Sequence, residues 1–400
     1  MKTIKIKYVL IIVLIITLGC KDEFLLETDN YKPILVVDGL ISNEKGPYII
    51  KITQSTPVNE YGEIPFQGCK VTLFENSNKS EVLYENEPGI YVTSETGIHG
   101  VIGNEYRISI ITPEGEEYNT EYQIIKEPVD IESIYAEEMV INKDGYPFGL
   151  PGYQFYTDTK TAPDQDNYFL WKMTESYQYN NDYELSRIYF GMEPLWINDS
   201  TWIPQEIIND TLFNIYKNNL YTCWNTQDIN YIYTGKTTNL AIPKITQQPL
   251  IFVGTDSKRL TNRYSILLNQ YTIGKEAYYF WEGIQEQSSQ ENLLVSTQPY
   301  NIKGNIINAN NPNELIFGFF TVASVNQKRI FVDNPRKPFY YPYCNVITDE
   351  QAMYDRFLQR SPPFYYVKVS GTVEGMVDFN CIDCRKAGGT NIKPEFWIDK

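Results

Sequence analysis

The chain has 400 residues, a formal net charge of −16 at pH 7, 42% hydrophobic residues and 14% aromatic residues. A protein this acidic repels phosphate backbones, so we expect no nucleic acid among its partners. The length allows two or three domains with sizeable cores, and the excess of Tyr and Phe over Met favours strands over helices.

The first segment has the pattern of a bacterial signal peptide. Three lysines precede an apolar run over residues 9–18, which is too short for a membrane-spanning helix of roughly 20 residues. The run ends at Gly19-Cys20, which resembles the lipobox of lipoproteins, whose cysteine is acylated (for example with palmitate) and becomes the mature N-terminus. We therefore predict a signal peptide over residues 1–19 and lipidation of Cys20, with an ordinary signal peptide as the alternative.

Residues 20–31 form a short acidic tether. Its sequence Lys21-Asp22-Glu23 resembles the export signal that sends lipoproteins of the Bacteroidota to the outer face of the outer membrane. A solvated linker could carry similar charges. We expect a lipid-anchored protein of the outer membrane that faces the cell surface.

Residues 32–127 alternate between short β-rich runs and turn residues. Strands are predicted at residues 34–41, 47–53, 68–75, 89–92, 106–111 and 117–122. In the third of these runs, Cys69, Val71 and Leu73 alternate onto one face. About seven strands in roughly 95 residues is a spacing typical of an immunoglobulin-like β-sandwich.

An acidic break containing Pro128 precedes a larger β-rich domain, predicted over residues 128–400. Its aromatic-rich strands are predicted at residues 153–156, 167–173, 264–271 and 315–322. Two short helices are also predicted, at residues 274–288 and 349–360. The first helix places Ala277, Tyr278 and Trp281 at helical spacing. The fold class is therefore mainly β, with two units in sequence.

Cysteines give a further constraint, because exported proteins sit in an oxidising compartment. Four of them are candidates for two disulfides with three possible connectivities: Cys223, Cys344, Cys381 and Cys384. Cys381-x-x-Cys384 also has the spacing of zinc ligands, but the exported location favours disulfides. Together with the Gly-rich residues that follow, this pair predicts a C-terminal clasp, while Cys69 is expected to be a buried thiol.

Few catalytic motifs are present. The single histidine, His99, lies between glycines in a predicted turn, and no Gly-x-Ser-x-Gly elbow or nucleotide-binding glycine loop occurs. One imidazole cannot make a His-rich metal site, although a pair of carboxylates remains open as a hydrolase mechanism. Residues 164–167, Asp-Gln-Asp-Asn, could help to hold calcium but lack the glycine and distal glutamate of an EF-hand, so a turn is predicted. We expect no cofactor.

Aromatic residues are the best candidates for ligand or partner contact. They gather in a polar stretch and comprise Tyr177, Tyr179, Tyr183, Tyr189, Trp196 and Trp202. Flat rings beside amides suit sugars, peptides, other amphipathic ligands or protein interfaces. Core packing is the alternative explanation for many of them.

Several short strings occur in an order that resembles one family. They lie at residues 35–41, 68–71, 89–91, 103–106, 128–135, 223–224, 263–266, 304–306, 328–331 and 381–397, with Cys69 where the family tends to have Ala. The chain resembles the Bacteroidota lipoproteins of domain of unknown function 4249. The resemblance implies an accessory partner of a TonB-dependent outer-membrane transporter.

Three functions fit these observations. The first is a non-enzymatic surface lipoprotein that binds an unidentified small ligand or assists a TonB-dependent transporter. The second is a surface hydrolase with a carboxylate pair. The third is an adhesin or structural surface protein.

Overall fold

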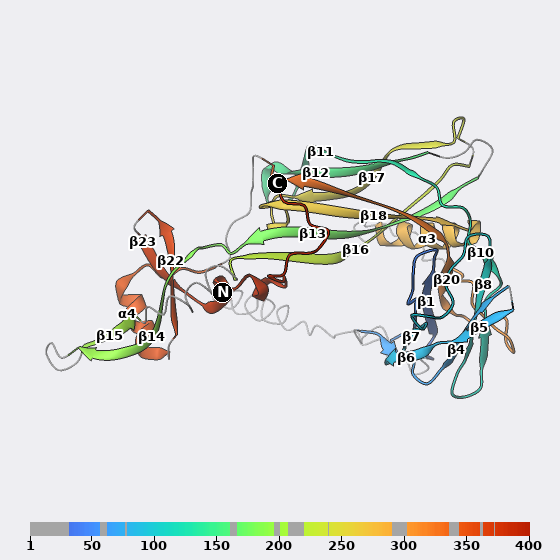
Figure 1. Ribbon diagram of the computed structural model, residues 1–400, viewed down its shortest axis with the longest axis horizontal. Helices are drawn as coiled ribbons and strands as arrows, with labels where there is room; N and C mark the ends of the chain where they lie inside the picture. Colours follow the sequence, from blue (N-terminus) through green and yellow to red (C-terminus); the bar gives the residue numbers. More distant parts are fainter. Residues whose placement is uncertain are drawn as a thin grey trace, which may run out of the picture.

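The computed structural model describes the chain from residue 32 to residue 400, apart from residues 57–61, 77, 161–165, 196–200, 207–219, 239, 290–301, 336–343, 361–362 and 372. The signal peptide, Cys20 and the tether lie outside the described residues. The protein is mainly β, as predicted, and consists of an N-terminal sandwich, a central sandwich and a C-terminal lobe (Figure 1). Within these described ranges, no helix has the length and apolar character needed to cross a membrane.

The N-terminal sandwich consists of two sheets. The first contains β1 (Leu35–Ile41), β2 (Ile49–Gln54), β3 (Ile64–Pro65), β6 (Tyr84–Glu87), β7 (Ile90–Val92) and β20 (Phe317–Val322). The second contains β4 (Lys70–Glu75), β5 (Lys79–Val82), β8 (Glu105–Ile111), β9 (Glu117–Asn119), β10 (Gln123–Ile124) and β19 (Ile307–Asn308). The inner faces of the two sheets form one hydrophobic core.

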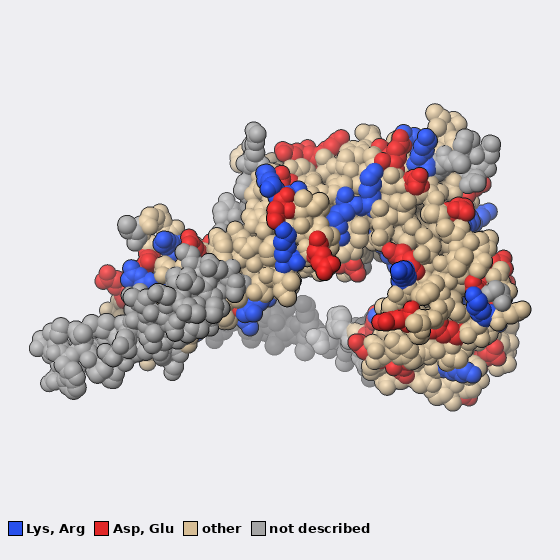
Figure 2. All heavy atoms as spheres, in the orientation of Figure 1, with Lys and Arg blue, Asp and Glu red and all other residues tan. Residues whose placement is uncertain are grey.

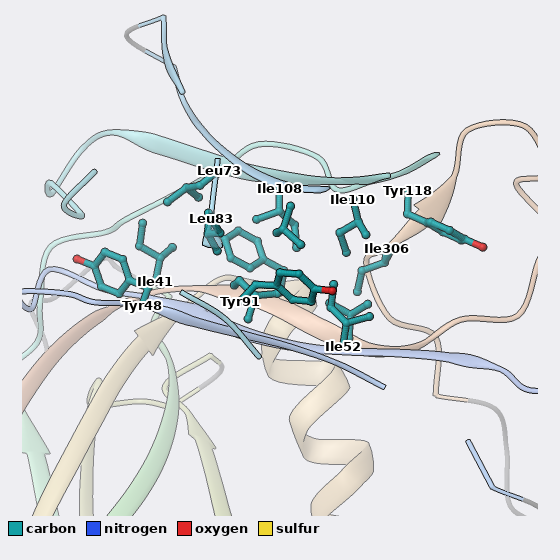
Figure 3. Packing of buried hydrophobic residues seen from close by; sticks show 14 of the residues in the cluster. Ile41, Tyr48, Ile52, Leu73, Leu83, Tyr91, Ile108, Ile110, Tyr118 and Ile306 are labelled. Carbon is teal, nitrogen blue, oxygen red and sulfur yellow. The ribbon is translucent and has the colours of Figure 1, made fainter. Parts of the chain in front are cut away.

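The predicted alternation in this sandwich is confirmed, because Cys69, Val71 and Leu73 are all buried in the core. A distant part of the chain completes the same core. Strand β20 pairs in parallel with β1, and Ile306 points into the core beside Ile52 and Ile110 (Figure 3). Residues 306–322, which lie in the range that we expected for the larger domain, therefore contribute strands and core residues to the N-terminal sandwich.

The central sandwich packs a three-stranded sheet onto a four-stranded sheet. The first contains β11 (Ile131–Lys143), β12 (Tyr146–Lys160) and β17 (Lys244–Gly254), and the second contains β13 (Tyr168–Asn180), β16 (Thr222–Lys236), β18 (Arg263–Ile273) and β21 (Ser324–Asp333). Phe155, Trp171 and Ile266 are fully buried between the two sheets. The short helix η1 (Lys258–Leu260) also contributes to this core through Leu260.

Helix α3 (Lys275–Ser289) covers the other face of the four-stranded sheet, next to the N-terminal sandwich (Figure 1). Ala277, Tyr278 and Trp281 are buried, as their spacing predicts. The ring centroids of Phe280 in α3 and Phe319 in β20 lie 5.0 Å apart. Because β20 leads directly into β21, both the chain and a shared hydrophobic cluster join the two sandwiches here.

The C-terminal lobe lies at the opposite end of the central sandwich (Figure 1). It contains β14 (Leu185–Leu195), β15 (Thr201–Glu206), β22 (Phe364–Ser370), β23 (Val373–Val377), α4 (Glu350–Gln359), η3 (Phe379–Cys381) and η4 (Cys384–Ala387). Helix α4 was predicted, and it begins after Asp349, whose side chain accepts a hydrogen bond from the backbone N–H of Ala352 at 2.8 Å.

Candidate functional site

A pocket of about 430 Å³ lies where β1, the four-stranded sheet and α3 meet. Figure 2 shows the surface hollowed at the corner between the N-terminal and central sandwiches. The side chains that give the pocket its chemistry are Asp38, Lys172, Asp228, Tyr231, Tyr271 and Trp281. This volume is suitable for a small ligand, and the junction between two units is a common location for such sites.

A bulge in β16 shapes one wall of the pocket. Trp171 pairs with Tyr233 and Met173 pairs with Ile229, so three residues of β16 oppose the single residue Lys172 of β13. The unpaired residues leave the regular ladder, and Tyr231 is 65% exposed as a result. The bulge therefore presents an aromatic ring at the pocket.

Two carboxylates line the pocket from different units. Asp38 lies on the outer face of β1, opposite Lys51 of β2, but Lys51 forms its ion pair with Glu63. Asp228 accepts a hydrogen bond from the Thr174 hydroxyl at 2.8 Å. Within the described part of the chain, neither Asp38 nor Asp228 has an ion-pair partner.

A cation and two further rings complete the pocket. The Lys172 ammonium lies 5.0 Å from the centroid of the Trp281 ring. Tyr271 is half-buried, and burial, together with the charges of Glu44 and Asp228, raises its pKa to about 12. The Tyr271 hydroxyl therefore stays protonated near neutral pH and can donate a hydrogen bond.

The predicted aromatic contact residues lie elsewhere. Tyr179 is buried and donates from its hydroxyl to the Cys384 carbonyl at 2.6 Å, Tyr177 packs beside it, and Tyr183 packs on the core of the C-terminal lobe. These three residues therefore support packing around the cysteines, and Tyr179 cannot reach a ligand. Tyr189 lies on β14 and Trp202 on β15, but the side chains of both lie outside the described part of the structure, as does the whole of Trp196.

All four candidate cysteines form disulfides. Cys344 pairs with Cys381 within the C-terminal lobe, and Cys223 of β16 pairs with Cys384. The two cysteines of the Cys-x-x-Cys segment thus bond to different partners, and the Cys223–Cys384 disulfide ties the lobe to the central sandwich. The four sulfurs are therefore not available for zinc. Cys69 is a buried free thiol, as predicted.

The clasp is completed by close backbone contact and by one carboxylate. Thr390 exchanges two backbone hydrogen bonds with Trp224, each 2.8 Å long. The buried Asp383 binds the Arg385 guanidinium through both carboxylate oxygens at 2.9 Å. Burial alone would raise the pKa of Asp383, but its hydrogen bonds to Arg385 outweigh this and lower the pKa.

A buried polar cluster inside the central sandwich is structural. Glu175 accepts hydrogen bonds from the Tyr264 hydroxyl at 2.6 Å and from Gln227 at 2.6 Å, and Arg259 lies 3.4 Å away. Burial raises the pKa of Tyr264 well above its usual value, and the charge of Glu175 adds to this effect. The cluster attaches η1 to β13 and β18 and does not open into the junction pocket.

The remaining sequence candidates do not assemble a metal site in the described regions. His99 is exposed, and its backbone carbonyl accepts a hydrogen bond from the Tyr106 hydroxyl at 3.2 Å. Asp164 and Gln165 of the candidate calcium turn lie outside the described residues. Across the described ranges, no group of three His, Cys, Asp or Glu side chains is placed to hold a metal ion.

The pocket residues were not identified from the sequence. Trp281 was assigned only to the buried face of a helix, and Asp38 only to a strand. They come together because β20 pairs with β1 and brings the N-terminal sandwich against α3. Ile229, Tyr231 and Tyr233 alternate as in a regular strand, so no sequence signal indicates the bulge that brings Tyr231 to the pocket.

Comparison with known proteins supports the family resemblance. The sequence profile of Domain of unknown function (DUF4249) matches residues 21–329. No curated protein matches the chain. Because the matched range covers most of the sequence, the chain belongs to the family of domain of unknown function 4249.

Proposed function

We propose that this protein is a lipid-anchored binding protein of the outer-membrane surface that works with a TonB-dependent transporter. The observation that carries this proposal is the junction pocket, which combines three aromatic rings with charged groups from two units. Pockets with apolar walls and a few directed polar groups are typical of small-molecule sites. No nucleic acid is expected to bind this acidic protein.

The position of the tether supports the anchor. Strand β1 begins at Leu35, next to the backbone contact of Ile34 with Ser55, and its other end contacts Ala323 at the junction with the central sandwich. The tether therefore leads into the end of β1 that lies opposite the contact with Ala323. Twelve residues can span at most about 40 Å, so an acylated Cys20 could hold the N-terminal sandwich close to the lipid surface without touching it.

An exposed apolar region supports a protein partner. In the outer half of the long β11–β12 hairpin, Phe148 is 90% exposed and Val140 is 60% exposed. Exposed apolar side chains of this size often mark interaction surfaces. The hairpin tip lies at the end of the central sandwich remote from the N-terminal sandwich, where a transporter could contact it without covering the pocket.

Labelling cells with radioactive palmitate tests the anchor, and protease treatment of intact cells tests the location. We expect palmitate in the wild-type protein, none in a Cys20→Ser variant, and rapid cleavage of the protein on intact cells. Equal labelling of both proteins would contradict lipidation at Cys20. Protection from the protease until the cells are lysed would contradict surface exposure.

A carboxylate-dependent hydrolase is the second candidate, because Asp38 and Asp228 line the same pocket. Both residues are exposed, whereas a catalytic acid is usually buried enough to hold its proton at neutral pH. Turnover of a glycan or peptide library that is abolished by Asp228→Asn would favour this function over simple binding.

A further inference from the structure

The charges of the junction pocket are arranged in an unusual way. Asp38 and Asp228 come from different sandwiches, and among the described residues each lacks a cationic partner. Lys51, the cross-strand neighbour of Asp38, is paired with Glu63. The pocket cation, Lys172, lies over the Trp281 ring. The pocket therefore contains two carboxylates whose charge a ligand could neutralise.

Aromatic rings lie in the same pocket as these carboxylates. Tyr231 comes from the bulge of β16, three residues after Asp228, and Tyr271 lies close enough for the charge of Asp228 to raise its pKa. A cation between a carboxylate and a ring face gains both Coulomb energy and a cation–π interaction. The contact between Lys172 and Trp281 shows that an ammonium already lies over an aromatic ring in this pocket.

The surroundings favour the same ligand charge. Figure 2 shows acidic side chains gathered on the N-terminal sandwich where it borders the hollow. The whole chain carries a net charge of −16. A negative field over a hollow surface raises the local concentration of cations and lowers that of anions.

We infer that the junction pocket binds a ligand with a protonated amine next to a flat apolar group, with the ammonium held by Asp228 and Asp38 and the flat group against Tyr231. The inference rests on the proposed function, since it specifies the ligand class of the same pocket. Free amines, amino acids and peptide N-termini share this chemistry. Lys172 offers a contact for a carboxylate on the same ligand.

Isothermal titration calorimetry of the mature protein at pH 7 and low salt tests this inference. The probes are tyramine, tyrosine, the peptide Tyr-Gly-Gly, 4-hydroxyphenylacetate and maltotriose. Tyramine should bind at least tenfold more tightly than 4-hydroxyphenylacetate, which has the same ring but an anionic group. Tighter binding of tyrosine than of tyramine would indicate a free amino acid, and tighter binding of Tyr-Gly-Gly a peptide N-terminus.

Isosteric variants locate the amine. Asp228→Asn and Asp38→Asn should each weaken tyramine binding at least tenfold, whereas Asp144→Asn, in the exposed β11–β12 turn, should leave it unchanged. Circular dichroism and thermal unfolding verify that each variant is folded, and the two pocket variants act in different sandwiches. Should one of them fail to fold, the other still provides the test.

Three results would overturn the inference: no binding of tyramine, equal binding of tyramine by the wild type and a folded Asn variant, or tighter binding of maltotriose. Maltotriose binding that is lost in Tyr231→Ala would leave the proposed ligand pocket intact and change only the ligand class. Absence of a transporter partner would contradict the proposed function without affecting amine binding.

Discussion

The N-terminal sandwich and the C-terminal lobe are held together in different ways. The sandwich buries one large apolar core that draws on residues from 35 to 125 and from 306 to 322, and its one cysteine is a free thiol. The described core of the lobe is much smaller and includes Cys381. One disulfide cross-links the lobe internally, and a second links it to β16.

This difference shows how core size determines the need for cross-links. A unit that buries enough apolar surface offsets its conformational entropy by packing, even when its strands are far apart in sequence. A small unit buries a smaller fraction of its surface and gains more from covalent constraint of the unfolded chain. Four variants should distinguish stabilisation by core packing from stabilisation by cross-links.

The largest effect is expected from Phe320→Ala in the N-terminal sandwich. Phe320 is fully buried in the core, and its backbone N–H donates to the Asn305 side chain at 2.9 Å. Loss of the ring should reduce the free energy of unfolding by about 4 kcal/mol, measured by urea denaturation. Phe148→Ala is the control, since that ring is exposed, and an equal loss in both variants would mean that β20 does not belong to the core.

The second-largest loss of stability is expected when the disulfide that ties the lobe to the central sandwich is removed. Cys223 and Cys384 are 161 residues apart, so their bond restricts a long loop in the unfolded chain. The double variant Cys223→Ser/Cys384→Ser should lose about 3 kcal/mol of stability. In limited proteolysis the C-terminal lobe should be cut first.

Cys69→Ala provides the matched control for this cross-link, because it removes a thiol from the N-terminal sandwich without breaking a bond. Its proteolysis pattern should resemble that of the wild type. If the N-terminal sandwich of the double serine variant were cut before the lobe, the claim that the lobe depends more on cross-links than the sandwich does would be contradicted.

A smaller effect is expected from Gly389→Ala in the clasp. A β-carbon at this position would collide with the Tyr179 hydroxyl and come within 2.9 Å of the Trp224 carbonyl oxygen. The strain should reduce the free energy of unfolding by about 2 kcal/mol in thermal denaturation. At Gly274 the nearest atom would be 3.8 Å away, so Gly274→Ala should cost no more than the loss of a glycine N-cap, at most about 1 kcal/mol. Equal effects of the two variants would argue against a tight clasp.

The smallest effect depends on pH. Because the pKa of Asp383 is lowered in the folded protein, its ion pair with Arg385 contributes stability above the unfolded pKa near 4. That contribution is lost as the pH falls through the folded pKa. Asp383→Asn should therefore be about 1 kcal/mol less stable than the wild type at pH 7, with the difference shrinking in acid.

Thermal unfolding from pH 7 to pH 2 measures this convergence. Asp144→Asn is the control, because that exposed turn residue should give curves parallel to those of the wild type. A constant gap between Asp383→Asn and the wild type over the whole range would contradict the role of the ionised carboxylate.

Local pattern predicted much of the fold. The alternation of Cys69, Val71 and Leu73 and the helical spacing of Ala277, Tyr278 and Trp281 follow from contacts within single elements, and the structure confirms both. The cysteine inventory predicted two disulfides but left their pairing open, because pairing depends on which segments meet in space.

Long-range pairing was beyond the sequence pattern. Residues 317–322 read as an apolar strand, but nothing in that strand specifies β1 as its neighbour. The candidate pocket depends on this pairing, because Asp38 and Trp281 meet only once the N-terminal sandwich lies against α3. Tyr179 was placed among the contact candidates for a related reason, since only the fold shows that its ring is buried against Cys223 and Cys384.

The central claim is that the protein works at the outer membrane as the partner of a transporter. Its most direct test is mild detergent extraction of native envelopes, followed by affinity purification of the mature protein and mass spectrometry of what co-purifies. We predict one outer-membrane barrel of the TonB-dependent type in a stoichiometric ratio, reduced when Phe148 is changed to Ser. Recovery of the protein alone, without any such barrel, would contradict the account.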